Sequence, residues 1–432
     1  MQNRIRTARP VRNGEVEGRT GSPGTLPKSA GGTCVDTIVR RRYIQFALSE
    51  FSARMPGMQM SGEMARMEPR DRMFAAIGRE PVDRFPFSTY NCHPFAWGAH
   101  LGEPAYEPIL RKIDETSAGC LCKTSARAKT ARSAHSSETR TEGDTSYTTV
   151  TWHTPKGPLT RVTRTPAGQP GMCVKPYIVE PVDVERYLSV TYELVRWDVS
   201  TAVEHATELG PKGIAYLGYG DPFYHVSDLF DQEDFAIRVI TEPDFIRQLV
   251  DAEFERVRGN LQTMLEALAG HDVPFLFYTA GPERATPPLL SPDVFERLVV
   301  PYQTKLVNLI HDAGYPASLH CHGRVRDVLP HAITCGYDVI EPLEPPPQGD
   351  IELKDLREVA GDRIALMGYV QDQDFYLLSE AEMRGRIHEI TTCIGDSSGY
   401  ICCPTCTPFQ YPPTEAYVRN FVAFLDEADK GN

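Results

Sequence analysis

Residues 291–323 read SPDVFERLVVPYQTKLVNLIHDAGYPASLHCHG, which predicts a helix followed by a strand. Ser291 and Pro292 are typical of a helix start, because serine caps the first free N–H groups and proline fits the first turn. The apolar residues behind them share one helical face: Phe295, Leu298, Val299, Tyr302, Leu306, Leu309 and Ile310. Pro301 predicts a kink in this helix, and Gly314 predicts its end. Residues 317–320 are then predicted to form a short strand.

The same alternation continues on both sides of this unit. Further short strands are predicted at residues 214–217, 275–278, 338–341, 364–367 and 400–402, with helical patterns between them. Repeated strand–helix units imply a parallel sheet. At least six strands over about 350 residues favour an α/β fold of the (β/α)8 TIM-barrel class. A doubly wound open sheet is the alternative, although no G-x-G-x-x-G or Walker sequence supports a nucleotide-binding version.

Two segments depart from this pattern. Residues 1–65 are rich in Arg, Gly, Ser and Pro, which predicts a disordered N-terminal extension before a barrel over residues 66–432. An organelle transit peptide, or a native start at Met64 or Met67, remains an alternative for this extension. Residues 140–165 alternate Thr, Val and Tyr with polar residues around a Pro-Lys-Gly turn, which predicts a small β-hairpin within a β-rich insertion at about 118–175.

The composition limits the classes of partner and compartment. The 432 residues carry a formal net charge of -13, which argues against nucleic-acid binding, because neutralising phosphates requires a surplus of Lys and Arg. No apolar run approaches the roughly 18 residues of a membrane span. Eleven cysteines without a secretory signal pattern predict a cytoplasmic protein with reduced thiols. Clustered Cys and His therefore favour metal ligands or inert core residues over disulfides.

Ionisable residues gather where the predicted strands end. In a parallel barrel these carboxyl ends line the active site. The candidates there are Asp221, Glu283, His320, His322, Glu341, Glu344, Gln371, Cys402, Cys403 and Cys406.

The pair His320 and His322 is the strongest candidate for a metal site. Side chains two residues apart on a strand point the same way, so both imidazoles can face one ion. Two imidazoles and a thiolate suit zinc, and Cys406 from the last strand end is the predicted third ligand. Three protein ligands leave an open position, which is typical of a catalytic site. A tight turn with hydrogen-bonded histidines, and a redox pair of Cys403 with Cys406, are the alternatives.

The carboxylates at the strand ends have more than one interpretation each. Glu283 is a candidate metal ligand or general base, or else a surface partner of Arg284. Glu341 and Glu344 are candidates for orienting the imidazoles or for capping a loop, and Glu341 is also a candidate catalytic residue, as a metal ligand or proton acceptor. Asp221 is a candidate acid/base residue or a helix N-cap.

Four segments together resemble the uroporphyrinogen decarboxylase superfamily. They are EPRDRMFAAIGREPVDRFPF (68–87), LLSPDVFERLVVPYQTKLVNLIHDAGYPASLHCHG (289–323), GDRIALMGYVQ (361–371) and TCTPFQYPPTEAYVRNFVAFL (405–425). The resemblance covers roughly residues 67 to 428 and implies a (β/α)8 barrel.

One branch of this superfamily comprises metal-free decarboxylases of porphyrin biosynthesis. The chain resembles this branch overall, and Asp221 in GYGDPF is the nearest match to its catalytic aspartate. However, residues 88–100 read STYNCHPFAWGAH where that branch has an arginine-containing signature. An octacarboxylate substrate needs several arginine forks, and the segment lacks them.

The other branch comprises zinc-dependent methyltransferases that work with a corrinoid. Their motif is His-x-Cys-Gly on one strand and Cys on the last, which His320 and Cys406 match and His322 alters. The resemblance implies methyl transfer between a small O-, N- or S-methylated substrate and cobalamin supplied by a partner corrinoid protein. A histidine ligand makes the site less anionic, which favours activation of a methylated oxygen or nitrogen. A homodimer is a further expectation.

Overall fold

The computed structural model describes residues 66–129, 135–169 and 171–430, so the predicted N-terminal extension lies outside the described residues. Seven parallel strands form the main sheet in the order β1-β8-β9-β10-β11-β12-β13. Their bounds are β1 Cys120–Thr124, β8 Gly213–Gly218, β9 Phe275–Ala280, β10 Ala317–His320, β11 Val339–Leu343, β12 Ala365–Val370 and β13 Tyr400–Pro404. A doubly wound sheet reverses its strand order at a switch point. This order follows the chain without reversal, so the doubly wound alternative is excluded.

A short segment, residues 86–89, connects the two edges of the curled sheet and is called the bridging segment below. The Ser88 N–H donates to the Cys402 carbonyl of β13 at 2.9 Å, and the Gly119 N–H beside β1 donates to the Phe87 carbonyl at 2.8 Å. Parallel bridges join Phe87 to Cys402 and Ser88 to Gly119. The sheet is compatible with a TIM-barrel-like fold, with seven regular strands and this bridging segment.

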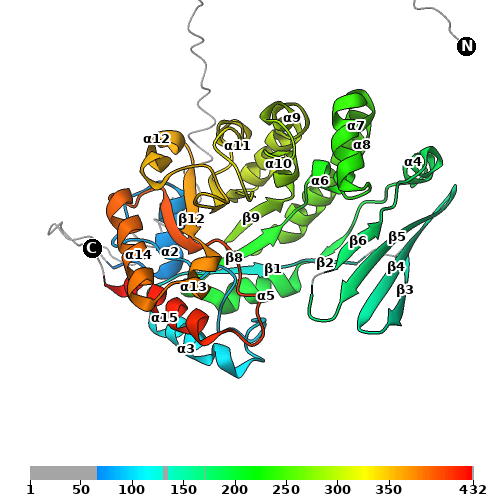
Figure 1. The fold of residues 1–432 in the computed structure, drawn as a ribbon. Coiled ribbons are helices and arrows are strands. Elements are labelled where there is room, and N and C mark those ends of the chain that lie inside the picture. The colour runs from blue at the N-terminus through cyan, green and yellow to red at the C-terminus, as the bar shows by residue number, and fades with distance from the viewer. Residues whose placement is uncertain (1–65, 130–134, 170, 431–432) are drawn as a thin grey trace, which may run out of the picture.

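Helices follow the strands and pack around the outside of the sheet (Figure 1). They are α2 Pro69–Ile77, α3 Glu107–Glu115, α4 Pro181–Leu188, α5 Ser200–Leu209, α6 Pro222–Ser227, α7 Gln232–Thr241, α8 Pro243–Leu268, α9 Pro292–Leu298, α10 Val300–Asp312, α11 Leu329–Cys335, α12 Leu356–Ala360, α13 Asp372–Leu377, α14 Glu380–Ile394 and α15 Glu415–Asp429. The kink predicted at Pro301 is a full break, because Val299 leaves helical geometry between α9 and α10.

Two buried clusters occupy the two faces of the sheet. The larger cluster lies between the sheet and the surrounding helices. The smaller cluster fills the inside of the curled sheet with the alternate strand residues that point inward, which include Leu121, Ile214, Leu276, Val339, Met367 and Ile401. Met73, Ala76 and Ile77 of α2 join this inner cluster, so α2 packs against the amino ends of the strands. The opposite, carboxyl ends remain for the site.

An antiparallel sheet projects from one side of the parallel sheet (Figure 1). It contains β3 His135–Glu142, β4 Thr145–Thr154, β5 Gly157–Pro166 and β6 Met172–Lys175, in that order. The predicted Pro-Lys-Gly turn connects β4 to β5. Residues 120–124, which the sequence analysis included in the insertion, are instead β1 of the parallel sheet. Two further short strands, β2 Arg127–Ala128 and β7 Trp197–Asp198, pair with each other. In the sequence they flank the antiparallel sheet, β2 before β3 and β7 after β6.

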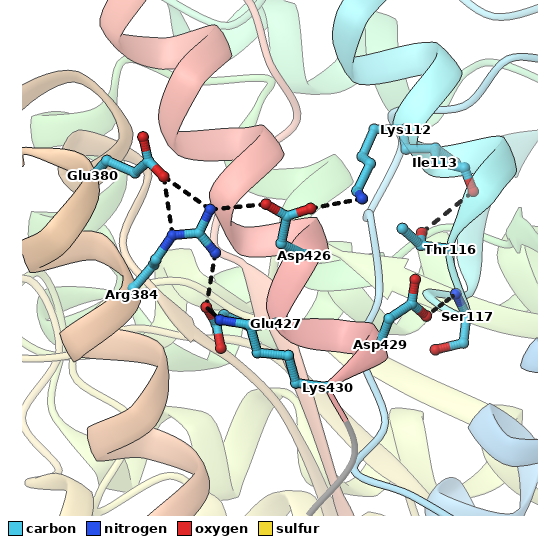
Figure 2. A network of polar contacts seen from close by, with 10 residues as sticks. All are labelled: Lys112, Ile113, Thr116, Ser117, Glu380, Arg384, Asp426, Glu427, Asp429 and Lys430. Carbon is cyan, nitrogen blue, oxygen red and sulfur yellow. Dashed lines mark hydrogen bonds and ion pairs between the residues drawn. The ribbon is translucent and has the colours of Figure 1, made fainter.

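A polar network holds α3, α14 and α15 together (Figure 2). Arg384 of α14 binds Glu380 on its own helix and Asp426 of α15, each at 2.8 Å, and Glu427 at 2.9 Å. Lys112 of α3 reaches the other oxygen of Asp426 at 2.6 Å. The network therefore links α3 to two helices, α14 and α15, that follow it by more than 260 residues in the sequence.

Among the helices of the described residues, none combines the length and apolarity that crossing a bilayer requires. The ten cysteines of the described chain are all free thiols.

Candidate active site

The inner parity of the strands carries the polar residues of the site. His320 is two residues beyond Ser318 on β10, and Glu341 is two residues beyond Val339 on β11. The register places His320 directly beside Glu341. Since side chains at i and i+2 share a face, both point into the curled sheet near its carboxyl end.

Glu341 is the centre of a buried hydrogen-bond network. The His320 ring nitrogen Nδ1 lies 2.9 Å and 3.0 Å from the two carboxylate oxygens. The Tyr90 hydroxyl donates to Glu341 Oε2 at 2.9 Å, and the Tyr216 hydroxyl donates to Oε1. Burial raises the pKa of Glu341. The charge and hydrogen bond of His320 and the hydrogen bonds of the two tyrosines lower it by more, so the pKa is below its ordinary value. Glu341 therefore stays ionised and orients the His320 ring.

His322 has its own carboxylate. Its Nδ1 lies 3.4 Å from Glu344 Oε1, and the other Glu344 oxygen accepts the Gly323 N–H at 2.7 Å. Burial lowers the pKa of His322, but Glu344 and the more distant Glu341 raise it above its ordinary value. The two imidazole centres are 4.8 Å apart and nearly perpendicular. In both rings the carboxylate occupies Nδ1, which leaves Nε2 for another partner.

Cys406 follows β13 but is not joined to the histidines in one metal-binding group. Its Sγ donates to the Thr407 carbonyl at 3.2 Å. Burial raises the pKa of the thiol to about 11, Asp372 raises it as well, and the charge of Lys123 lowers it. Within the described residues no three His, Cys, Asp or Glu side chains come close enough to hold a metal. The donors nevertheless suit zinc chemically, since two oriented imidazoles and a half-buried thiol are available.

Asp221 caps a helix. Its Oδ1 accepts the Tyr224 N–H of α6 at 2.5 Å, and its Oδ2 accepts the Gln303 side-chain N–H at 2.5 Å. Burial raises the pKa of Asp221 to about 6, although both of these hydrogen bonds lower it. Both oxygens are thus engaged, and the side chain is only 1% exposed. Of its two interpretations, the N-cap describes this geometry.

Glu283 lies in the short helical turn Pro282–Ala285 that follows β9. Its Oε2 accepts the Gly281 N–H at 2.8 Å. It does not pair with Arg284, whose guanidinium reaches Ser227 at 2.9 Å and Asp228 at 3.3 Å. The negative charge of Glu283 contributes to the raised pKa of His322, so Glu283 faces the same region.

The sequence analysis missed three residues of this site. Tyr90 adopts φ 53°, a left-handed conformation that is rare for a bulky residue and is held here by its neighbours. Its hydroxyl lies 3.2 Å from His320 Nδ1. Tyr216 and Lys123 follow the inner residues Ile214 and Leu121 at i+2, a signal that strand parity could have supplied. Assigning 118–124 to an insertion hid Lys123.

A cavity of about 450 Å³ lies elsewhere, between α14 and α15. Its lining includes Phe85, Phe87, His388 and Lys430, and none of the strand-end candidates contributes to it.

Comparison with known proteins identifies the family. Residues 169–428, more than half of the chain, match the family described as uroporphyrinogen decarboxylase (URO-D). The chain belongs to this family, which confirms the resemblance seen in the sequence. No curated protein matches the chain.

Solved structures share the fold at low sequence identity. A methyltransferase from Methanosarcina mazei is 18% identical with a TM-score of 0.53, covering 84% of this chain and 99% of its own. A B12-independent methionine synthase from Shewanella sp. W3-18-1, in complex with selenomethionine, is 13% identical with a TM-score of 0.37, covering 62% and 70%. The first likeness concerns the fold, and the second is too distant to bear on function.

Proposed function

We propose that this chain is a zinc-dependent methyltransferase that moves a methyl group between a small methylated substrate and cobalamin carried by a partner corrinoid protein. The observation that carries the proposal is the pair of carboxylate-oriented imidazoles, His320 with Glu341 and His322 with Glu344. Carboxylate–histidine pairs of this kind are typical of metal ligands. The fold of the Methanosarcina mazei methyltransferase supports the same class.

The ligands would be His320 and His322 through Nε2, with the Cys406 thiolate completing the set. Bound zinc supplies Lewis acidity to the heteroatom that carries the methyl group. Glu341 acts through His320 as a positioning residue, because it is fully buried and cannot touch substrate. Glu283, partly exposed in the same region, is the group that takes up or returns the heteroatom's proton.

Elemental analysis of the purified protein tests the proposal. We expect about one zinc ion per chain. His322→Ala and Cys406→Ser should lower the zinc content, whereas Cys393→Ser, which changes an exposed thiol, should not. Absence of zinc together with unchanged metal binding by His322→Ala would refute the metal site.

A corrinoid assay addresses the reaction class. Because zinc would activate the methylated heteroatom, addition of a methylated substrate should convert added cob(I)alamin to methylcobalamin, seen in the absorbance spectrum, only when His320 and His322 are intact. Turnover of uroporphyrinogen without metal or corrinoid would instead assign the chain to the cofactor-free decarboxylases.

A further inference from the structure

Lys123 occupies the end of β1 on the inner face of the sheet. It follows Leu121, a member of the inner cluster, at i+2, and its backbone N–H donates to the Asn91 side chain at 2.8 Å. Strand β1 pairs with β8, so Lys123 is directly beside Tyr216 in register. The ammonium therefore belongs to the mouth that also contains Glu341 and His320.

Aromatic faces surround this ammonium. The Lys123 nitrogen lies 5.5 Å from the centre of the Tyr90 ring and 5.8 Å from that of Tyr278. Tyr90 in turn hydrogen bonds to Glu341 and lies 3.2 Å from His320. One side chain thus connects the cation to the histidine site, and the two ring faces restrict where the ammonium can point.

Among the described residues, no carboxylate pairs with Lys123. In the part of the chain that the structure describes, its ammonium forms no ion pair and donates no hydrogen bond. The nearby carboxylates have other donors: Glu341 accepts from His320 and the tyrosines, and Glu344 accepts the Gly323 N–H. A partly buried cation without a counter-charge is costly unless an anion from outside approaches it.

We infer that Lys123 binds an anionic group of the substrate, so that the methylated molecule is a small acid with its heteroatom directed toward His320 and His322. This inference rests on the proposed function, because it assigns the substrate class of the same site. Tyr90 and Tyr278 flank the apolar linker between the acid and the heteroatom. The ammonium and the imidazoles then recognise the two ends of one molecule.

Matched methyl ethers test the inference. Methoxyacetate and 2-methoxyethanol differ mainly in the negative charge, and ligand-observed NMR titration of the purified full chain gives both affinities. We expect methoxyacetate to bind about fivefold more tightly, the effect of one partly screened charge pair. Lys123→Met should remove this preference and Lys123→Arg should retain most of it, while the affinity for 2-methoxyethanol stays unchanged.

Lys156→Met is the matched control, because Lys156 is exposed in the turn between β4 and β5 and, within the described residues, pairs with Glu185 at 3.2 Å. It should keep the preference, and thermal unfolding of each variant checks that the fold is intact. Equal binding of the two ethers by the wild type, or a preference that survives Lys123→Met, would overturn the inference. A wild-type protein that holds no zinc but prefers methoxyacetate contradicts only the proposed function. A wild-type protein that holds zinc but lacks this preference contradicts only the inference about Lys123.

Discussion

At the scale of the residue, Glu341 shows how hydrogen bonding decides the state of a buried acid. Its side chain is fully buried, which alone favours the neutral acid. Three donors reverse that preference, because His320, Tyr90 and Tyr216 all direct hydrogen toward its oxygens. The ionised carboxylate in turn favours the tautomer with hydrogen on Nδ1 when the His320 ring is neutral, and that tautomer has its lone pair on Nε2.

Glu341→Gln is therefore expected to weaken zinc affinity by about 10- to 100-fold, because the amide orients the imidazole less strongly. Competition with a chromophoric zinc chelator measures the change. Glu358→Gln, on the exposed surface of α12, is the control and should match the wild type. Wild-type affinity in Glu341→Gln would show that the carboxylate does not tune the histidine.

At the scale of the element, α14 and α15 are joined by charges as well as by apolar packing. Ser379 and Glu382 form a capping box at the start of α14, and Thr414 caps α15. Arg384 then contacts Glu380, Asp426 and Glu427 at once, with about 29% of its side chain exposed. A shared arginine loses less conformational entropy for each contact than separate pairs would.

We expect Arg384→Met to lower the free energy of unfolding by about 1–2 kcal/mol, since the exposed fraction limits each pair. The loss should diminish in high salt. Arg386→Met is the matched control, because its best contact is an exposed pair with Glu389 at 3.4 Å, and it should change stability by under about 0.5 kcal/mol. Urea unfolding compares them, and equal effects would refute the importance of the network.

Elements with local signals could be predicted from the sequence, and elements defined by distant pairing could not. The interruption near Pro301 was predicted, because it follows from proline geometry. Strand β1 was hidden in the polar stretch around Cys120-x-Cys122, and the bridging segment 86–89 has strand partners only from opposite ends of the chain. Its pairing depends on tertiary contacts, which periodicity does not record.

In the candidate site too, residues with a local sequence pattern could be predicted and residues brought in by distant contacts could not. Strand parity predicted that His320 and His322 lie on one side. Their ring centres are 4.8 Å apart, but β10 ends at His320, so the loop and Glu344 position His322 rather than the pleat. Tyr90 reaches His320 from 230 positions away in the chain, and no local pattern encodes that contact. The grouping of Cys406 with the histidines stays a prediction.

At the scale of the whole molecule, the inner cluster is closed by α2, which is held against the amino ends of the strands by a buried ion pair. Arg72 of α2 is 2% exposed and binds both oxygens of Asp83, at 2.6 Å and 3.1 Å. The same guanidinium donates to the Ser117 carbonyl at 3.1 Å and to the Met67 carbonyl at 2.6 Å. One buried cation thus fixes α2 to the loops that precede the bridging segment and β1.

Asp83→Asn is expected to cost about 3 kcal/mol at pH 7, because it leaves Arg72 buried without its counter-charge. Burial raises the pKa of Asp83, but Arg72, the Met67 N–H and Arg84 lower it below its ordinary value. A lowered pKa stabilises the fold above the unfolded value near 4, and the benefit is lost as pH falls through the folded value.

The difference in unfolding free energy between wild type and Asp83→Asn should therefore be constant above about pH 5 and decrease below about pH 4. Urea unfolding at a series of pH values measures it. Asp71→Asn, which removes a more exposed pair with Arg70, should show little difference at any pH. A difference independent of pH would exclude the ion pair as its cause.

The segment 86–89 gives the molecule an order of assembly. It connects β13 with β1, and the next residue, Tyr90, supplies a hydroxyl to Glu341 and His320. A nascent chain that has not yet released residue 402 from the ribosome lacks the partner on which this segment is anchored. Such a chain can carry both histidines before Tyr90 is held against them, so the site is completed only after residue 402 has joined the sheet.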